Sequence, residues 1–102
     1  MPDLTSKQRA RLRAMAHDID TIVHIGKDGV GPGIIKQADD ALEARELITG
    51  KVLENSPLSP REGAEELARA ARAEVVQVIG SKFVLYRETH SKPKEKRIKL
   101  IK

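Results

Sequence analysis

Apolar side chains recur along the chain at two spacings, those of helices and of strands. In three segments they return every three or four residues, as on the buried side of a helix. We expect these helices over residues 5–16, 32–46 and 59–71. Short apolar or alternating stretches predict strands over residues 21–25, 47–53, 75–79 and 83–87. The order α-β-α-β-α-β-β predicts an α/β fold, in which three helices pack against a mixed four-stranded sheet.

Capping residues indicate where two of the helices begin. Ser59 and Glu62 have the spacing of a capping box, in which each side chain binds the backbone N–H of the other residue. Pro60 suits the first position of that helix, where its missing N–H is not needed. Thr5 and Gln8 repeat the capping-box spacing before the first apolar segment. We therefore expect helices to begin just after Thr5 and Ser59.

The last two strands are separated by Gly80 and Ser81, a two-residue loop typical of a β-hairpin. Counting outward from this loop predicts the cross-strand pairs Ile79–Lys82, Val78–Phe83, Val76–Leu85 and Glu74–Arg87. The other face of the hairpin is too apolar to be freely solvated, so we expect the first helix or the C-terminal tail to cover part of it. Its apolar residues are Val75, Ile79, Val84 and Tyr86. In the second strand, Gly50 predicts a bulge.

A glycine-rich loop, Gly26-Lys27-Asp28-Gly29, follows the first strand and precedes a helix that starts near Pro32. Glycine lets a backbone approach a ligand closely, and the N–H groups at a helix start favour an anion. The Gly-x-x-Gly pattern with a basic residue inside is typical of KH-type modules, which clamp the backbone of RNA. In open α/β sheets, ligands bind at the carboxyl ends of strands, where this loop should lie. A turn that only joins strand to helix is the alternative interpretation.

The distribution of charge separates a neutral body from a basic tail. The chain has 102 residues and a formal net charge of +4. Residues 1–87 contain thirteen Lys or Arg and thirteen Asp or Glu, whereas residues 88–102 contain six basic and two acidic residues. We expect a single domain over residues 1–88, followed by a flexible basic tail over residues 89–102 that adds nonspecific affinity for RNA.

Composition argues against several classes of function. The chain has no cysteine, and no apolar run reaches the length of ~18 residues needed to span a membrane. Its histidines, His17, His24 and His90, are isolated from any set of acidic residues with ligand spacing. We therefore expect no catalysis, cofactor, metal or membrane contact, and a monomeric cytoplasmic protein.

Several blocks of sequence together resemble the YhbY family, the bacterial stand-alone form of the CRM RNA-binding domain. These blocks are Thr5-Ser6-Lys7-Gln8-Arg9, Gly26-Lys27-Asp28-Gly29, Ala41-Leu42-Glu43-Ala44-Arg45-Glu46-Leu47-Ile48, Lys51-Val52-Leu53-Glu54-Asn55 and Val76-Gln77-Val78-Ile79-Gly80-Ser81-Lys82-Phe83-Val84-Leu85-Tyr86-Arg87. The resemblance covers roughly residues 4 to 88. It implies a fold similar to the C-terminal domain of translation initiation factor three. It also implies association with ribosomal RNA in precursors of the large ribosomal subunit during ribosome assembly.

Two positions depart from the family pattern. Loops of the family usually read Gly-Lys-Gly-Gly, whereas this chain has Asp28 at the third position. A carboxylate beside Lys27 should repel phosphate and weaken the contact. Thr49-Gly50 also stands where the family tends to have Lys-Val, which removes one cation. We therefore expect RNA binding that depends more on the flanking basic residues.

The candidate RNA-binding residues comprise the glycine loop and basic residues elsewhere in the chain. They are Gly26, Lys27, Asp28, Gly29, Lys7, Arg11, Arg13, Lys36 and Lys82. The basic residues would contact phosphates and would not read bases. The alternative is a protein-interaction module, in which the acidic face of the second helix docks a basic ribosomal protein or assembly factor. That face carries Asp39, Asp40 and Glu43.

Overall fold

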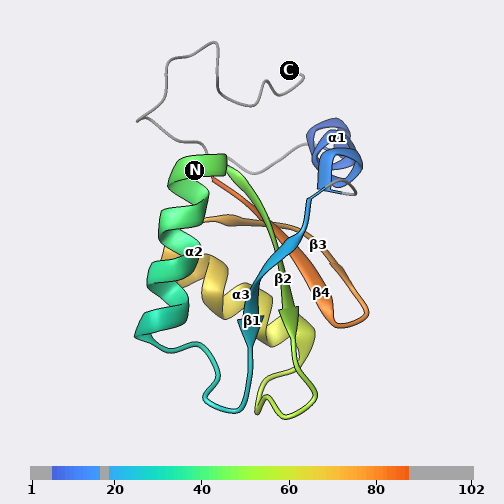
Figure 1. Ribbon diagram of the computed structural model, residues 1–102. Helices are drawn as coiled ribbons and strands as arrows, with labels where there is room; N and C mark the ends of the chain where they lie inside the picture. Colours follow the sequence, from blue (N-terminus) through green and yellow to red (C-terminus); the bar gives the residue numbers. More distant parts are fainter. Residues whose placement is uncertain (1–5, 17–18, 88–102) are drawn as a thin grey trace.

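A computed structural model describes residues 6–16 and 19–87 of the chain. Seven elements follow one another in the predicted order (Figure 1). The helices are α1 (Ser6–Ala16), α2 (Pro32–Arg45) and α3 (Pro60–Ala71). The strands are β1 (Thr21–Ile25), β2 (Leu47–Val52), β3 (Glu74–Ile79) and β4 (Lys82–Tyr86). The expected α/β class and element order are therefore confirmed, while Thr5 and the tail over residues 89–102 lie outside the described residues.

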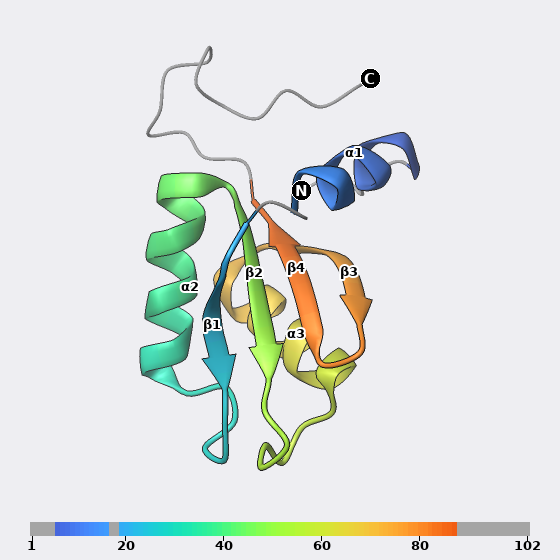
Figure 2. The same cartoon turned by 45° about the vertical axis from the view of Figure 1, so that its right-hand side comes forward.

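The four strands form one mixed sheet in the order β1-β2-β4-β3 (Figure 2). β1 and β2 are parallel, and β4 is antiparallel to both β2 and β3. The terminal hairpin therefore places β4 inside the sheet and β3 at its edge. The carboxyl end of β1, the carboxyl end of β2 and the β3–β4 turn all lie at the same end of the sheet (Figure 2).

Helices cover the two faces of the sheet unequally. α2 and α3 pack on one face, where their apolar residues and the inward side chains of the strands form the larger core around Leu42, Leu67 and Phe83. α1 packs on the opposite face, where Leu12 meets Val84 and other side chains of the strands. Of the two covers predicted for the second face of the hairpin, the first helix is confirmed. Val75 was wrongly placed on that face, because it packs against the larger core. Because α1 spans only part of that face, we call the remainder the open face.

The register of the hairpin differs from the prediction beyond its first two pairs. Ile79–Lys82 and Val78–Phe83 face each other as expected, but the pairing shifts by one residue between Val75 and Gln77. Leu85 consequently pairs with Val75, and the expected Val76–Leu85 pair is wrong. The expected pair of Glu74 with Arg87 is also wrong, because Glu74 lies opposite Tyr86.

Arg9 of α1 contacts the backbone at this bulge. Its guanidinium donates hydrogen bonds to the carbonyl oxygens of Val75 and Val76. Val75 packs with the α2–α3 side and Val76 packs with α1, as expected of successive strand residues. The bulge then leaves Gln77 opposite Val84, on the same face as Val76. A bulge adds one residue to one strand of a pair, which alternation along that strand alone does not reveal.

Gly50 has a role other than the predicted bulge. It pairs in regular register with Phe83 of β4, and a Cβ atom built at Gly50 would lie 2.2 Å from the Cζ atom of the Phe83 ring. The irregularity lies in the neighbouring strand β1, where Ile22 is the extra residue between the pairs Thr21–Thr49 and Val23–Gly50. Glycine is therefore required in β2 because an aromatic ring occupies the space of a side chain.

The predicted capping box at the start of α3 is confirmed. The backbone N–H of Glu62 donates to the Ser59 hydroxyl at 3.2 Å, and the backbone N–H of Ser59 donates to Glu62 Oε1 at 3.1 Å. The hydrogen bond from the Ser59 backbone, followed by that with its hydroxyl, lowers the pKa of Glu62 from its ordinary value of 4.5.

Candidate nucleic-acid interface

The glycine loop forms a tight turn at the carboxyl end of β1. The backbone N–H of Gly29 donates to the carbonyl oxygen of Gly26 at 3.0 Å, which places Lys27 and Asp28 at the exposed corner. Gly29 itself is buried and has a φ of +65°, a conformation that other residues rarely adopt. The turn therefore presents Lys27 and Asp28 side by side to solvent.

The loop between β2 and α3 packs beside this turn, as the two ribbon views agree (Figures 1 and 2). A Cβ atom at Gly26 would lie 3.7 Å from Leu53 Cδ1, and one at Gly29 would lie 3.7 Å from Pro57 Cγ. The backbone N–H of Leu53 also donates to the Ile25 carbonyl at 2.8 Å. These contacts fix the position of the glycine turn on the end of the sheet.

Helix α2 begins three residues after the turn. Its N-cap residue is Gly31, which has no side chain to bind the first N–H groups, and Pro32 occupies the first turn. The following N–H groups have no partner within the helix. The first N–H groups of α2 can therefore donate to an anion next to the turn that carries Lys27.

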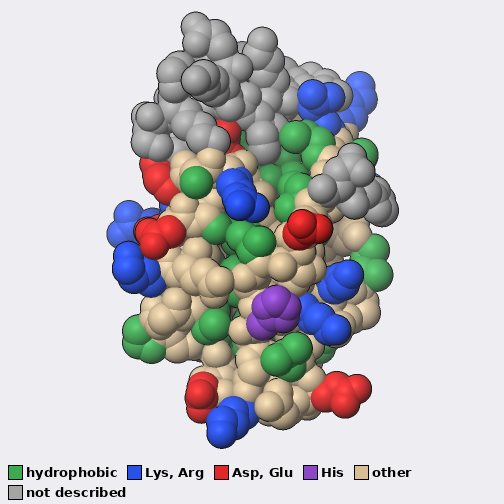
Figure 3. All heavy atoms as spheres, viewed as in Figure 1, with side chains coloured by type: hydrophobic (Ala, Val, Ile, Leu, Met, Phe, Trp, Pro, Cys, Tyr) green, Lys and Arg blue, Asp and Glu red, His purple; other side chains and the backbone are tan. Residues whose placement is uncertain are grey.

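A row of basic side chains crosses the open face beside the glycine turn. His24 of β1 is in register with Lys51 of β2, and Lys51 lies directly opposite Lys82 of β4. Their neighbours Val23, Ile25, Val52 and Phe83 belong to the core on the other face, so the three side chains share the open face. Figure 3 shows a histidine beside Lys or Arg side chains on this side of the molecule. We call His24, Lys51 and Lys82 the basic row.

Neither lysine of the basic row is neutralised within the described part of the chain. Among residues 6–16 and 19–87, Lys51 and Lys82 take part in no ion pair, whereas Lys36, Arg61 and Arg87 each do. Like charges directly opposite each other destabilise a sheet. An anion bound over Lys51 and Lys82 would remove that repulsion.

Sequence reasoning found Lys82 but missed Lys51 and His24. The signal available in the sequence was alternation along β1 and β2, which places His24 and Lys51 on the face opposite the larger core. Their adjacency to Lys82 depends on β4 pairing with β2 in the order β1-β2-β4-β3. That pairing joins strands about thirty residues apart in sequence, so no local pattern reveals it.

The basic residues of α1 lie at different positions relative to the basic row. Arg13 lines a hollow on the open face together with Lys82, so these two predicted residues are brought together. Lys7 and Arg11 are exposed one helical turn apart on α1, outside that hollow. α1 therefore extends a basic surface from the hollow toward its own N-terminus.

Lys36 is in the opposite layer of the molecule. It lies on α2 and forms an exposed ion pair with Asp40, with Nζ and Oδ2 3.2 Å apart. Its charge is thereby partly compensated, unlike that of Lys51 or Lys82. The sheet therefore separates Lys36 from two other predicted basic residues, Arg13 and Lys82.

The acidic face of α2 is occupied by cations of the same molecule. Arg87 donates to Asp39 Oδ1 at 2.6 Å and to Glu43 Oε2 at 3.2 Å, while Asp40 pairs with Lys36. Arg87 also donates to the carbonyl oxygen of Ala71 at 2.8 Å, so it ties α2 to the end of α3. Its side chain is only 14% exposed. Arg87 is thus a structural residue, bound to α2 where Glu74 was expected.

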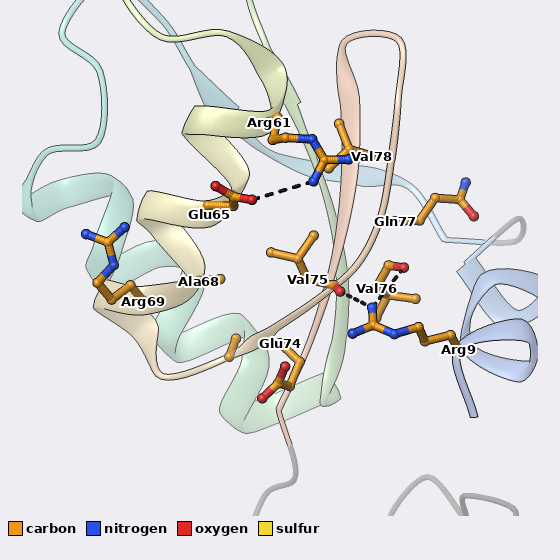
Figure 4. A pocket seen from close by; sticks show the side chains of 11 residues that line it. Arg9, Arg61, Glu65, Ala68, Arg69, Glu74, Val75, Val76, Gln77 and Val78 are labelled. Carbon is orange, nitrogen blue, oxygen red and sulfur yellow. Dashed lines mark hydrogen bonds and ion pairs between the residues drawn. The ribbon is translucent and has the colours of Figure 1, made fainter. Parts of the chain in front are cut away.

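A larger hollow of about 560 Å³ runs between β3 and α3 (Figure 4). Three of its charged side chains, Arg9, Arg61 and Glu65, are engaged inside the molecule. Arg9 binds backbone carbonyls of β3, and Arg61 pairs with Glu65 at 3.5 Å. None of the sequence-predicted site residues lines this hollow.

Neither a group of metal ligands nor a helix that could span a membrane is found in the described part of the chain. Over residues 6–16 and 19–87, no group of three or more His, Cys, Asp or Glu side chains gathers as metal ligands would. No helix within the same residues is long and apolar enough to cross a membrane.

Comparison with known proteins agrees with this arrangement of elements. The model of the CRS1/YhbY (CRM) domain matches residues 4–87. The probable RNA-binding protein YqeI of Bacillus subtilis is 45% identical over 86 residues, which cover 84% of this chain and 90% of that protein. An RNA-binding protein of Haemophilus influenzae is 32% identical over 87 residues, covering 85% of this chain and 88% of its own length.

A solved structure shares both the fold and much of the sequence. The solution structure of a hypothetical protein from Staphylococcus aureus superimposes with a TM-score of 0.79 and 50% sequence identity, covering 97% of this chain and all of that one. A family match over most of the chain, with relatives this similar, identifies the family that the sequence blocks resembled. The chain belongs to the CRS1/YhbY (CRM) domain family.

Proposed function

We propose that this protein binds RNA by its phosphate backbone, through the glycine turn and the basic row beside it. The observation that carries the proposal is the position of the exposed Lys27 turn at the same end of the sheet as Lys51 and Lys82, two lysines without acidic partners among the described residues. The names of the relatives, probable RNA-binding protein and RNA-binding protein, support RNA as the polyanion.

The contacts follow from the geometry of the turn. Gly26 and Gly29 close the tight turn, with Gly29 in a conformation that other residues rarely adopt. The turn holds Lys27 at the solvent side, where it supplies charge to a phosphate. The uncapped start of α2 adds N–H donors. Asp28 opposes this attraction, which makes the flanking cations Lys51 and Lys82 more important than the turn alone.

The wider basic surface would extend the contact. Arg13 continues it from Lys82 onto α1, and Lys7 and Arg11 prolong it along that helix. Lys36, paired with Asp40 in the other layer, would contribute least. Each contact acts by releasing counterions, so affinity should fall steeply as salt rises.

The target that we propose is ribosomal RNA in precursors of the large subunit, bound during ribosome assembly in the cytoplasm. This step rests on the resemblance to the YhbY family. We further propose that the chain acts as a monomeric binding protein without catalysis, with one domain over residues 1–88 and a basic tail over residues 89–102 that adds nonspecific affinity.

Docking of a basic protein on the acidic face of α2 is less well supported. Asp39 and Glu43 already bind Arg87, and Asp40 binds Lys36, so a partner would have to displace these contacts. Salt sensitivity alone does not separate the two functions, because both are electrostatic. The residues on which binding depends do separate them.

The proposal is tested by sedimenting tagged cell extracts through sucrose gradients and sequencing the RNA crosslinked to the protein. One variant replaces Lys27, Lys51 and Lys82 by Gln. The control replaces Arg61, Arg69 and Arg72, exposed on or next to α3, by Gln and removes the same charge. We expect the natural chain and the control on large-subunit precursors and the first variant free of them. Equal sedimentation of both variants on precursors would contradict the proposal, as would free migration of all three proteins.

A further inference from the structure

A hollow of about 240 Å³ lies on the open face, between the C-terminal half of α1 and the strands. Arg13 reaches it from α1, while β2, β3 and β4 contribute Thr49, Gln77 and Lys82. It borders the basic row through Lys82. Its volume is smaller than that of ordinary small-molecule pockets, so it suits a single planar group.

Thr49 contributes an unusual group to this hollow. The residue is 7% exposed, and its Oγ1 atom is buried without a hydrogen-bond partner among the described residues. Buried hydroxyls are nearly always paired, because an unpaired one has lost its bonds to water without replacement. Because Thr49 lines the hollow, a ligand bound there can supply the hydrogen-bond partner that its hydroxyl lacks.

The rest of the lining combines apolar walls with further polar groups. Val84 is buried, and Ile79 is 63% exposed, an unusual position for a large apolar side chain. Gln77, directly opposite Val84 in the sheet, adds an amide that can both donate and accept. Arg13 and Lys82 add positive charge. In the sheet, Val84 lies between Thr49 and Gln77. A hydroxyl and an amide on either side of an apolar floor match the edges and face of a nucleobase, and the two cations match its flanking phosphates.

We propose that this hollow takes one unpaired base of the bound RNA. The Thr49 hydroxyl and the Gln77 amide bind opposite edges of the base, Ile79 and Val84 pack against its face, and Arg13 and Lys82 hold the adjoining phosphates. Recognition of single-stranded RNA generally uses bases turned out of the stack in this way. The inference rests on the proposed RNA binding and adds base selectivity to a contact that otherwise reads only the backbone.

The test measures affinity by fluorescence anisotropy for equal-length RNAs built from adenosine, cytidine or uridine alone, and for a matching abasic ribose-phosphate chain. We expect the natural chain to prefer one base by about tenfold, the scale of one well-formed set of base contacts. The abasic chain should bind more weakly than the preferred RNA. Thr49→Val keeps the shape of the side chain and removes a hydroxyl that has no partner among the described residues. This variant should abolish the preference.

Lys82→Gln is the matched control for a phosphate contact. It should lower affinity for all four ligands by a similar factor, the abasic chain included, and leave the base preference in place. Gln77→Leu should behave like Thr49→Val. A circular dichroism spectrum and a melting curve for each variant establish that the fold is retained.

The results separate this inference from the proposed function. If the natural chain binds all four ligands equally, or if Thr49→Val keeps the preference, the base pocket is wrong while backbone binding stands. If the natural chain binds none of them, the proposed function is wrong and the base pocket falls with it. Loss of preference in Thr49→Val together with uniform weakening in Lys82→Gln supports both.

Discussion

Lys51 of β2 lies directly opposite Lys82 of β4 on the open face of the sheet. His24 continues the row on β1, next to the glycine turn. Two lysines in this relation repel each other across a distance at which sheet side chains interact. The proposed binding of an RNA phosphate over the two lysines would offset this repulsion.

Removing one of the two lysines should therefore stabilise the free protein while it weakens RNA binding. We expect Lys82→Gln to raise the free energy of unfolding by about 0.3 kcal/mol at low salt, because a cross-strand repulsion is lost. The gain should disappear at high salt, where the charges are screened. Urea titrations at two salt concentrations measure the effect. A loss of stability at low salt would show that Lys82 is a structural cation instead.

Asp28 should restrain the affinity of the glycine turn. Asp28→Asn removes a carboxylate beside Lys27 and keeps a side chain of similar shape. One charge at contact distance in water contributes about 1 kcal/mol, so RNA affinity should rise on the order of fivefold. Anisotropy titrations with a short single-stranded RNA measure the change. Unchanged affinity would indicate that phosphate does not approach this turn, and Glu65→Gln on α3 is the control for a remote carboxylate.

Gly50 should be intolerant of a side chain. Gly50→Ala places a Cβ atom against three atoms of the Phe83 ring, at 2.2, 2.6 and 2.9 Å, so we expect a loss of about 1–3 kcal/mol or more in the free energy of unfolding. Gly33→Ala is the control, since nothing lies within 4 Å of a Cβ atom there and alanine favours the helix. Phe83→Leu should recover part of the loss in the double variant. Equal stability of the two alanine variants would contradict the close packing of Phe83.

Arg87 should hold α2 and α3 together. Arg87→Met keeps much of the apolar stem but removes the hydrogen bonds to Asp39, Glu43 and the carbonyl of Ala71. We expect a loss of about 2 kcal/mol, because the guanidinium is largely buried and the Ala71 carbonyl loses its donor. Arg69→Met, on the exposed side of α3, should cost much less. Urea denaturation compares the two, and similar small losses would refute this role.

The capping box of α3 should depend on pH through Glu62. Because the pKa of Glu62 is lowered in the folded state, its ionised form stabilises the fold above the ordinary carboxyl value of 4.5. That contribution should be lost as the pH falls through the lowered pKa. The difference in melting temperature between the natural chain and Glu62→Gln should thus shrink below pH 4.5. A difference that stays constant from neutral to acidic pH would contradict this assignment.

Local signals predicted much of the fold because they act within a few residues. The Ser59–Glu62 capping box and the Gly80–Ser81 turn are contacts between near neighbours, and both occur as expected. The cover of the hairpin by the first helix was also predictable, because an apolar sheet face requires a partner. The glycine turn was recognised from its pattern alone.

Features that depend on distant parts of the chain were not predictable in this way. The bulge between Val75 and Gln77 coincides with a contact from Arg9, more than sixty residues earlier in the sequence. The same bulge places Glu74 opposite Tyr86 and not opposite Arg87. Arg87 instead binds the acidic side chains of α2. Lys51 joins the candidate site only because β4 inserts beside β2, an arrangement set by the packing of the whole sheet.

The most direct test is the salt dependence of RNA affinity for the variant in which Lys27, Lys51 and Lys82 are replaced by Gln. Each phosphate contact to single-stranded RNA contributes about 0.7 to the slope of log affinity against log salt. We expect the slope to fall by roughly 2, with weaker binding at every salt concentration. The control with Arg61, Arg69 and Arg72 replaced by Gln should keep the slope of the natural chain. The same slope and affinity in both variants would contradict RNA binding by the glycine turn and the basic row.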